Sequence, residues 1–159
     1  MADEKKKVEV VFSPAMYPHF EKPGANVAVV DILRATSAIC TAFMNGVSKV
    51  IPVPSQEEAR IAKQNGYLVA AERDGRVLDF ADFGNSPFNF TRDRIEGKEV
   101  AYSTTNGTKA VHMARDSRNV LIASFLNISA VANFLIEQDE NVLIFCAGWK
   151  GRFSLEDTL

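Results

Sequence analysis

Residues 100–109, which read VAYSTTNGTK, change abruptly from an apolar run to hydroxyl and amide side chains followed by a glycine. A helical pattern follows from Thr108, so the segment predicts a strand that runs directly into a helix N-terminus. Unpaired N–H groups and the positive end of the helix dipole suit a phosphate, sulfonate or carboxylate. The alternative is an ordinary helix cap that binds nothing. The predicted anion-binding residues are Ser103, Thr104, Thr105, Asn106, Gly107 and Thr108.

Asp31 is the second candidate, because it interrupts an apolar strand immediately before a predicted helix. A carboxylate in such a position needs a cation, a proton or hydrogen bonds, and a metal ion or Arg34 could supply them. The guanidinium of Arg34 is itself suited to phosphate or sulfonate, and equally to a carboxylate partner. A structural alternative for Asp31 is to cap the helix that begins near Ala35.

Polar residues also follow the carboxyl ends of other predicted strands. In an open parallel sheet these ends form one edge, where ligands bind. Glu72 could hold a metal ion there or simply pair with a neighbouring arginine. Lys109, Lys150 or Arg152 could contact a second anionic group. The further residues expected at this edge are Glu72, Ser124, Asn127, Gly148 and Arg152.

Glu156 and Asp157 lie in what reads as the first turn of a helix starting at Ser154. Acids in a first helical turn are favoured by the dipole whatever else they do, so their position is compatible with a structural or a catalytic role. Cys146 and Arg152 have the spacing of cysteine phosphatases, in which a thiolate attacks phosphorus. The match is loose, and we expect Cys146 to be a buried apolar residue instead.

Composition limits the classes of function. The 159 residues are 47% apolar and carry a net charge of −2. We therefore expect one α/β domain over residues 1–159, without the basic excess of a nucleic-acid-binding protein. No apolar run is long enough to span a membrane and no signal peptide is recognisable, which predicts a cytoplasmic protein. A homo-oligomer remains compatible with the sequence, because several phenylalanines fall in one loop.

Short β-branched runs alternate with amphipathic segments along the chain. This order predicts a three-layer α/β/α fold with a mostly parallel, or mixed, central sheet. Residues 74–97 break the alternation and are expected to form a functional loop or excursion. The predicted strands are 8–12, 27–32, 49–53, 67–71, 100–103, 120–124 and 142–146, and the predicted helices are 35–45, 55–65, 108–115 and 129–137.

Several of these segments together resemble the 2-phosphosulfolactate phosphatase family. The resemblance rests on residues 29–37 (VVDILRATS), 71–73 (AER), 84–87 (GNSP), 103–108 (STTNGT) and 146–157 (CAGWKGRFSLED). It implies a layered α/β fold and Mg²⁺-dependent hydrolysis of 2-phosphosulfolactate to sulfolactate and phosphate, a step of coenzyme M biosynthesis. Family members continue beyond the SLED segment, so we expect residues 1–159 to be the N-terminal portion of a longer family chain.

Energetics favour a metal ion if the reaction is phosphate ester hydrolysis. Enzymes accelerate this reaction by up to about 10²¹-fold, or roughly 28 kcal/mol. A helix terminus contributes only about 0.3–2 kcal/mol per charge contact, whereas a divalent cation adds several kcal/mol and suits carboxylate ligands. The predicted catalytic residues are Asp31, Arg34, Glu156 and Asp157, and the predicted Mg²⁺ ligands are Asp31, Glu72, Glu156 and Asp157.

Three alternatives to this phosphatase remain open at this stage. The chain could bind a phosphorylated or sulfonated acid without turning it over. It could also hydrolyse another phosphorylated 2-hydroxy acid. A purely structural oligomerisation domain is the third alternative, which the number of polar residues at one sheet edge disfavours.

Overall fold

The computed structural model describes residues 5–20 and 23–159, and its elements follow the predicted order. The strands are β1 (Val8–Val11), β2 (Asn26–Val30), β3 (Lys49–Pro52), β4 (Leu68–Arg73), β5 (Arg76–Val77), β6 (Glu99–Ser103), β7 (Asn119–Ala123) and β8 (Val142–Cys146). The helices are α1 (Tyr17–Phe20), α2 (Ala35–Met44), α3 (Gln56–Gln64), α4 (Arg92–Ile95), α5 (Gly107–Met113) and α6 (Ile128–Ile136), with short 3₁₀ turns η1 (Pro14–Met16) and η2 (Pro87–Asn89).

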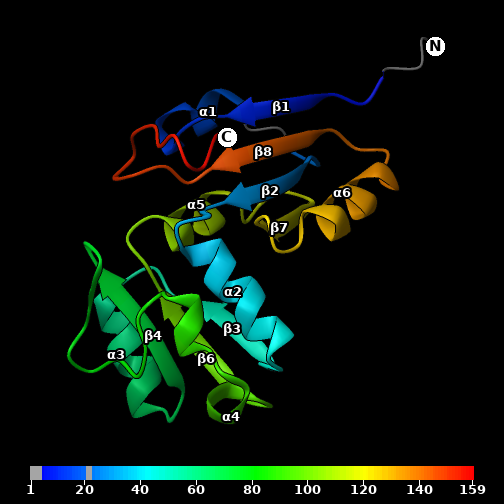
Figure 1. Ribbon diagram of the computed structural model, residues 1–159. Coiled ribbons are helices and arrows are strands. Elements are labelled where there is room, and N and C mark those ends of the chain that lie inside the picture. The colour runs from blue at the N-terminus through cyan, green and yellow to red at the C-terminus, as the bar shows by residue number, and fades with distance from the viewer. Residues whose placement is uncertain (1–4, 21–22) are drawn as a thin grey trace.

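The strands form two sheets, and all pairs except one are parallel. The first, which we call the β2 sheet, has the order β1-β8-β2-β7, and the second, the β6 sheet, has the order β3-β6-β4-β5. Among the strands of residues 5–20 and 23–159, only β4 and β5 pair in antiparallel fashion, and a tight turn at Asp74 and Gly75 joins them. The layered, mostly parallel α/β class is therefore confirmed, with its strands divided between two sheets that lie on either side of α2 in Figure 1.

Helices cover both faces of the β2 sheet. Val27 and Val29 point to one face, where they pack with residues of α1 and α5 in a closed core. Ala28 and Val30 point to the other face, toward α6. This two-sided burial explains why the strand is continuously apolar instead of alternating. The helix α6 itself is strongly apolar, yet none of its residues is fully buried.

The β6 sheet is also covered on both faces. On one face α3 packs against Val69 and Ala101. On the other face α2 and the segment 74–97 pack against Tyr102, and Phe83 and Phe90 of that segment are buried there. The excursion expected at 74–97 thus contributes to the core, while also carrying β5, η2 and α4.

Two local differences from the sequence pattern concern the ends of elements. The strand that was expected to end at residue 71 continues as β4 to Arg73, because Glu72 and Arg73 pair with β5. No helix starts at Ser154; residues 155–158 form a turn instead, closed by a hydrogen bond from the N–H of Thr158 to the Leu155 oxygen. Among the described residues, no helix is both long and apolar enough to cross a membrane.

Candidate functional site

The carboxyl ends of strands from both sheets lie around the connection between β6 and α5. β2 ends directly before Asp31, and β4 and β6 lie side by side with Ala71 opposite Ser103. Glu72 and the residues after Ser103 therefore emerge next to each other. The connection then crosses to α5, which packs on the β2 sheet. We call residues 104–107 of this connection the corner.

Asp31 is buried at this junction. Its Oδ1 accepts a hydrogen bond from the N–H of Ala35 at 3.2 Å, and its own N–H donates to Thr36 Oγ1. Asp31 therefore holds the start of α2, as its structural alternative predicted. Burial raises the pKa of Asp31 to about 7, and repulsion from Asp157 and then Glu72 adds to the rise.

Asp157 accepts a hydrogen bond from the residue that follows Asp31, and the two carboxylates are close enough for their charges to repel. The N–H groups of Ile32 and Gly148 donate to its two carboxylate oxygens at 3.0 Å each. Burial raises the pKa of Asp157 to about 6, although both hydrogen bonds oppose the rise. Gly148 is required here, because it has φ +61° and a Cβ would collide with the carbonyl oxygen of Arg152. The turn after β8 therefore brings a second carboxylate to Asp31.

Glu72 is also buried, but its carboxylate is occupied by donors of the protein. Its Oε1 accepts from the N–H of Thr105 at 3.0 Å and from the Thr105 hydroxyl at 3.2 Å, and its Oε2 accepts from the N–H of Gly75 at 2.7 Å. The expected pairing with an arginine does not occur. Arg73 donates instead to the backbone oxygen of Glu72 and to Ser103 Oγ.

Other polar groups of the corner and of Thr108, which follows it, also form hydrogen bonds within the protein. The N–H of Thr108 donates to Thr104 Oγ1, and the N–H of Thr104 donates to Thr108 Oγ1. Asn106 precedes α5 but its side chain does not cap the helix; its Oδ1 accepts from the N–H of Lys150 at 2.8 Å. Direct binding of phosphate by residues 103–108 stays a prediction, and it requires some of these internal bonds to be exchanged.

Two cations approach the site from its rim. Arg34 is exposed and donates to Asn85 Oδ1 at 2.9 Å, so the expected alternative of a carboxylate partner is not what the structure contains. Lys150 Nζ forms an ion pair with Asp74 Oδ1 at 2.7 Å. Asp74 was not expected from the sequence as a site residue, although the Asp-Gly pair at 74–75 is typical of a hairpin turn.

The remaining predicted residues lie outside this cluster of contacts. Ser124 and Asn127 form a local turn after β7, in which the N–H of Ser124 donates to Asn127 Oδ1 at 2.9 Å. Glu156 is exposed, and a hydrogen bond from its own backbone N–H lowers its pKa. Lys109 and Arg152 are exposed as well.

Cys146 does not have the properties of a nucleophile. Its side chain is buried, and burial, followed by the nearby charge of Asp157, raises the pKa of the thiol to about 11. A catalytic thiolate needs the opposite shift. The expectation that Cys146 is buried is confirmed, and its surroundings disfavour the thiolate that the cysteine-phosphatase spacing would require.

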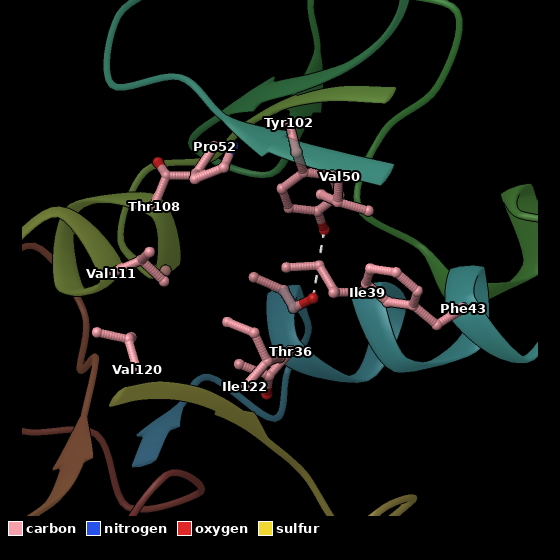
Figure 2. Close-up of a pocket in the computed structure, with 12 residues that line it drawn as sticks. Thr36, Ile39, Phe43, Val50, Pro52, Tyr102, Thr108, Val111, Val120 and Ile122 are labelled. Carbon is pink, nitrogen blue, oxygen red and sulfur yellow. Dashed lines mark hydrogen bonds between the residues drawn. The ribbon is translucent and has the colours of Figure 1, made fainter. Parts of the chain in front are cut away.

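A cavity of about 250 Å³ lies behind the corner, between the two sheets. Figure 2 shows its lining, in which Ile39, Val50 and Ile122 project from three different elements and the Tyr102 hydroxyl donates to the backbone oxygen of Ala35 at 3.5 Å. None of the lining residues carries a charge. A doubly charged phosphate ester therefore has no counter-charge there, and the polar junction above is the better candidate.

Comparison with known proteins gives one consistent result. A family model described as 2-phosphosulpholactate phosphatase matches residues 11–159. Relatives named probable 2-phosphosulfolactate phosphatase include one from Thermotoga petrophila, 47% identical over 131 residues, which are 82% of this chain and 57% of the relative. Another, from Clostridium novyi, is 38% identical over 154 residues, which are 95% of this chain and 66% of the relative. The chain thus spans between 57% and 66% of the length of these relatives.

Proposed function

Because the chain belongs to the 2-phosphosulpholactate phosphatase family, we propose that it hydrolyses the phosphate monoester of 2-phosphosulfolactate, giving sulfolactate and phosphate. The step is of the kind used in coenzyme M biosynthesis. The observation that carries the proposal is the burial of Asp31 and Asp157 beside each other where the two sheets meet. Burying two carboxylates that repel each other lowers the stability of the folded protein, and such pairs are commonly kept for function.

The carboxylates fit a magnesium ion. Mg²⁺ keeps several water ligands and takes one or two carboxylates, so it does not need a larger protein cage. This agrees with the part of the chain that the structure describes, where no group of three or more His, Cys, Asp or Glu side chains is placed to hold a metal. Asp31 would hold the ion, and Asp157 beside it would stay free to accept a proton. When bound, Mg²⁺ supplies several kcal/mol of charge stabilisation to the phosphoryl oxygens.

The protein's own residues supply binding and proton transfer in this proposal. The guanidinium of Arg34, whose fork matches a phosphate, binds the phosphoryl oxygens after it releases Asn85. Asp157, with its pKa of about 6, is ionised at neutral pH and accepts the proton of the attacking water at a carboxylate oxygen. The fixed N–H groups of Ile32 and Gly148 hold that carboxylate in one orientation.

Phosphate release from 2-phosphosulfolactate, measured with Mg²⁺ and with EDTA, tests the proposal. We expect release with Mg²⁺, none with EDTA and none for Asp31→Asn, whose circular dichroism spectrum should match that of the wild type. Asp79→Asn is the matched control, because Asp79 lies in an exposed ion pair with Arg60. Release that persists in EDTA or in Asp31→Asn would refute the mechanism. A phosphorylated 2-hydroxy acid that lacks the sulfonate tests the breadth of the substrate class.

A binding function without turnover is favoured by one observation. The chain spans only 57% to 66% of the relatives' length, so groups needed for turnover could lie elsewhere in those proteins. In that case sulfolactate or phosphate would raise the melting temperature, while no phosphate would be released under any metal condition. The phosphatase proposal expects both the shift and the release.

A further inference from the structure

Glu72 differs from the other two buried carboxylates in how its oxygens are used. Each oxygen of Asp157 accepts one hydrogen bond from the backbone, and Oδ1 of Asp31 accepts one from the N–H of Ala35 at 3.2 Å. Oε1 of Glu72 accepts two, from the N–H and the hydroxyl of Thr105, and Oε2 accepts a third from Gly75. A carboxylate oxygen has two lone pairs, so Oε1 has none left for a metal ion.

These three bonds connect segments that are distant in the sequence. Glu72 lies on β4, Gly75 lies in the β4–β5 turn, and Thr105 lies in the corner after β6. The Thr105 hydroxyl also accepts from the N–H of Asp74 at 3.2 Å. Both the backbone N–H and the hydroxyl of Thr105 therefore tie the corner to β4 and the β4–β5 turn. Glu72 accepts three of these four hydrogen bonds.

The position of Thr105 decides where the next residues of the corner lie. Gly107, two residues further, is packed so closely against Asp31 that a Cβ there would be 2.8 Å from Asp31 Oδ2. Asn106 is held from the opposite side by Lys150, whose Nζ pairs with Asp74 of the same turn. A displacement of Thr105 would move the backbone that contacts Asp31.

From this geometry we infer that Glu72 is a positioning residue, which fixes the corner against Asp31, and is not a ligand of the metal. The inference rests on the proposed function only for what Asp31 does; the role of Glu72 in fixing the corner stands on the contacts alone. Glu72→Gln keeps an oxygen that can accept from Thr105, but its amide N cannot accept from Gly75. Glu72→Ala removes both acceptor oxygens and, with them, all three hydrogen bonds.

Three measurements on the 159-residue chain test this inference: amide hydrogen exchange, Mg²⁺ affinity by calorimetry, and the kinetics of phosphate release. We expect Glu72→Gln to bind Mg²⁺ within about threefold of wild type, and its Gly75 amide to exchange at least tenfold faster. Glu72→Ala should lose protection at both Gly75 and Thr105. The kcat should fall in both variants, and more in Glu72→Ala. Glu99→Gln, at the exposed opposite end of β6, is the matched control and should change none of these values.

The outcomes separate the two roles of Glu72. A tenfold or larger loss of Mg²⁺ affinity in Glu72→Gln, with unchanged exchange at Gly75 and Thr105, would overturn the inference and make Glu72 a metal ligand. Should the wild type neither bind Mg²⁺ nor release phosphate, the proposed function fails while hydrogen exchange still decides the positioning role. If Glu72→Ala does not fold, Glu72→Gln carries the test.

Discussion

Gly107 lies directly against the carboxylate of Asp31: a Cβ at position 107 would be 2.8 Å from Asp31 Oδ2 and 2.7 Å from the Cβ of Ala35. The helix α5 can therefore begin beside α2 only if residue 107 has no side chain. β6 lies in one sheet and α5 packs on the other (Figure 1). The contact between Gly107 and Asp31 therefore lies where the chain crosses from the β6 sheet to the β2 sheet.

Gly107→Ala should therefore reduce activity more than its effect on stability explains. Overpacking of this kind costs about 1–3 kcal/mol of the free energy of unfolding. A displacement of about 1 Å at the reacting centre lowers the rate by roughly 100-fold. Gly97→Ala is the control, since Gly97 has φ +70° and no atom within 4 Å of an added Cβ. It should lose about 1 kcal/mol but keep its rate of phosphate release. Equal activity in the two variants would contradict the account.

Asp31 should destabilise the metal-free protein above pH 4. Its pKa rises from 3.8 in the unfolded chain to about 7 in the folded protein, so between these values the folded state binds more protons. The free energy of unfolding therefore falls as the pH rises from about 4 to about 7. At one pKa unit per about 1.4 kcal/mol, the loss is up to about 4 kcal/mol.

Urea unfolding in EDTA measures this effect. Asp31→Asn should lack this part of the pH dependence and be more stable than wild type at pH 8, by an amount that shrinks toward pH 4. Asp79→Asn, which changes an exposed aspartate, should follow the wild-type curve. An Asp31→Asn protein that is no more stable than wild type at pH 8 would be inconsistent with a buried, repelled carboxylate.

Asp157 should set the acid limb of the pH–rate profile. With a pKa of about 6, it becomes ionised, and able to accept a proton, as the pH rises through that value. The kcat/KM for phosphate release should increase over the same range. Asp157→Asn should lower kcat/KM by about 10²–10⁴-fold and remove the limb. A variant with a wild-type rate and an unchanged limb would assign the proton transfer to another group.

Cys146→Ala should retain activity within about twofold. The thiol is buried with a pKa near 11, so almost none of it is a thiolate at neutral pH. Cys40→Ala is the matched control, because Cys40 is also buried and burial raises its pKa as well. If only Cys146→Ala lost turnover, a covalent thiol mechanism would have to be reconsidered.

The sequence predicted the seven longer strands and the four longer helices, and the edge at which the candidate site lies, because strand ends are local signals. Asp31 and the corner were expected at one edge, and the structure brings them into contact. Hydrophobic periodicity identifies a strand but not its partners, so the division into two sheets was not predictable. For the same reason the sequence did not show that the N–H of Thr105 donates to Glu72, 33 residues away, and not to a ligand.

The most direct test of the proposed site is a crystal structure of the protein with Mn²⁺ in place of Mg²⁺ and with sulfolactate and phosphate present. We predict an anomalous peak in contact with a carboxylate oxygen of Asp31 and near Asp157, with phosphate density between that peak and Arg34. A Mn²⁺ ion bound elsewhere, with Asp31 free of metal and of anion, would contradict it.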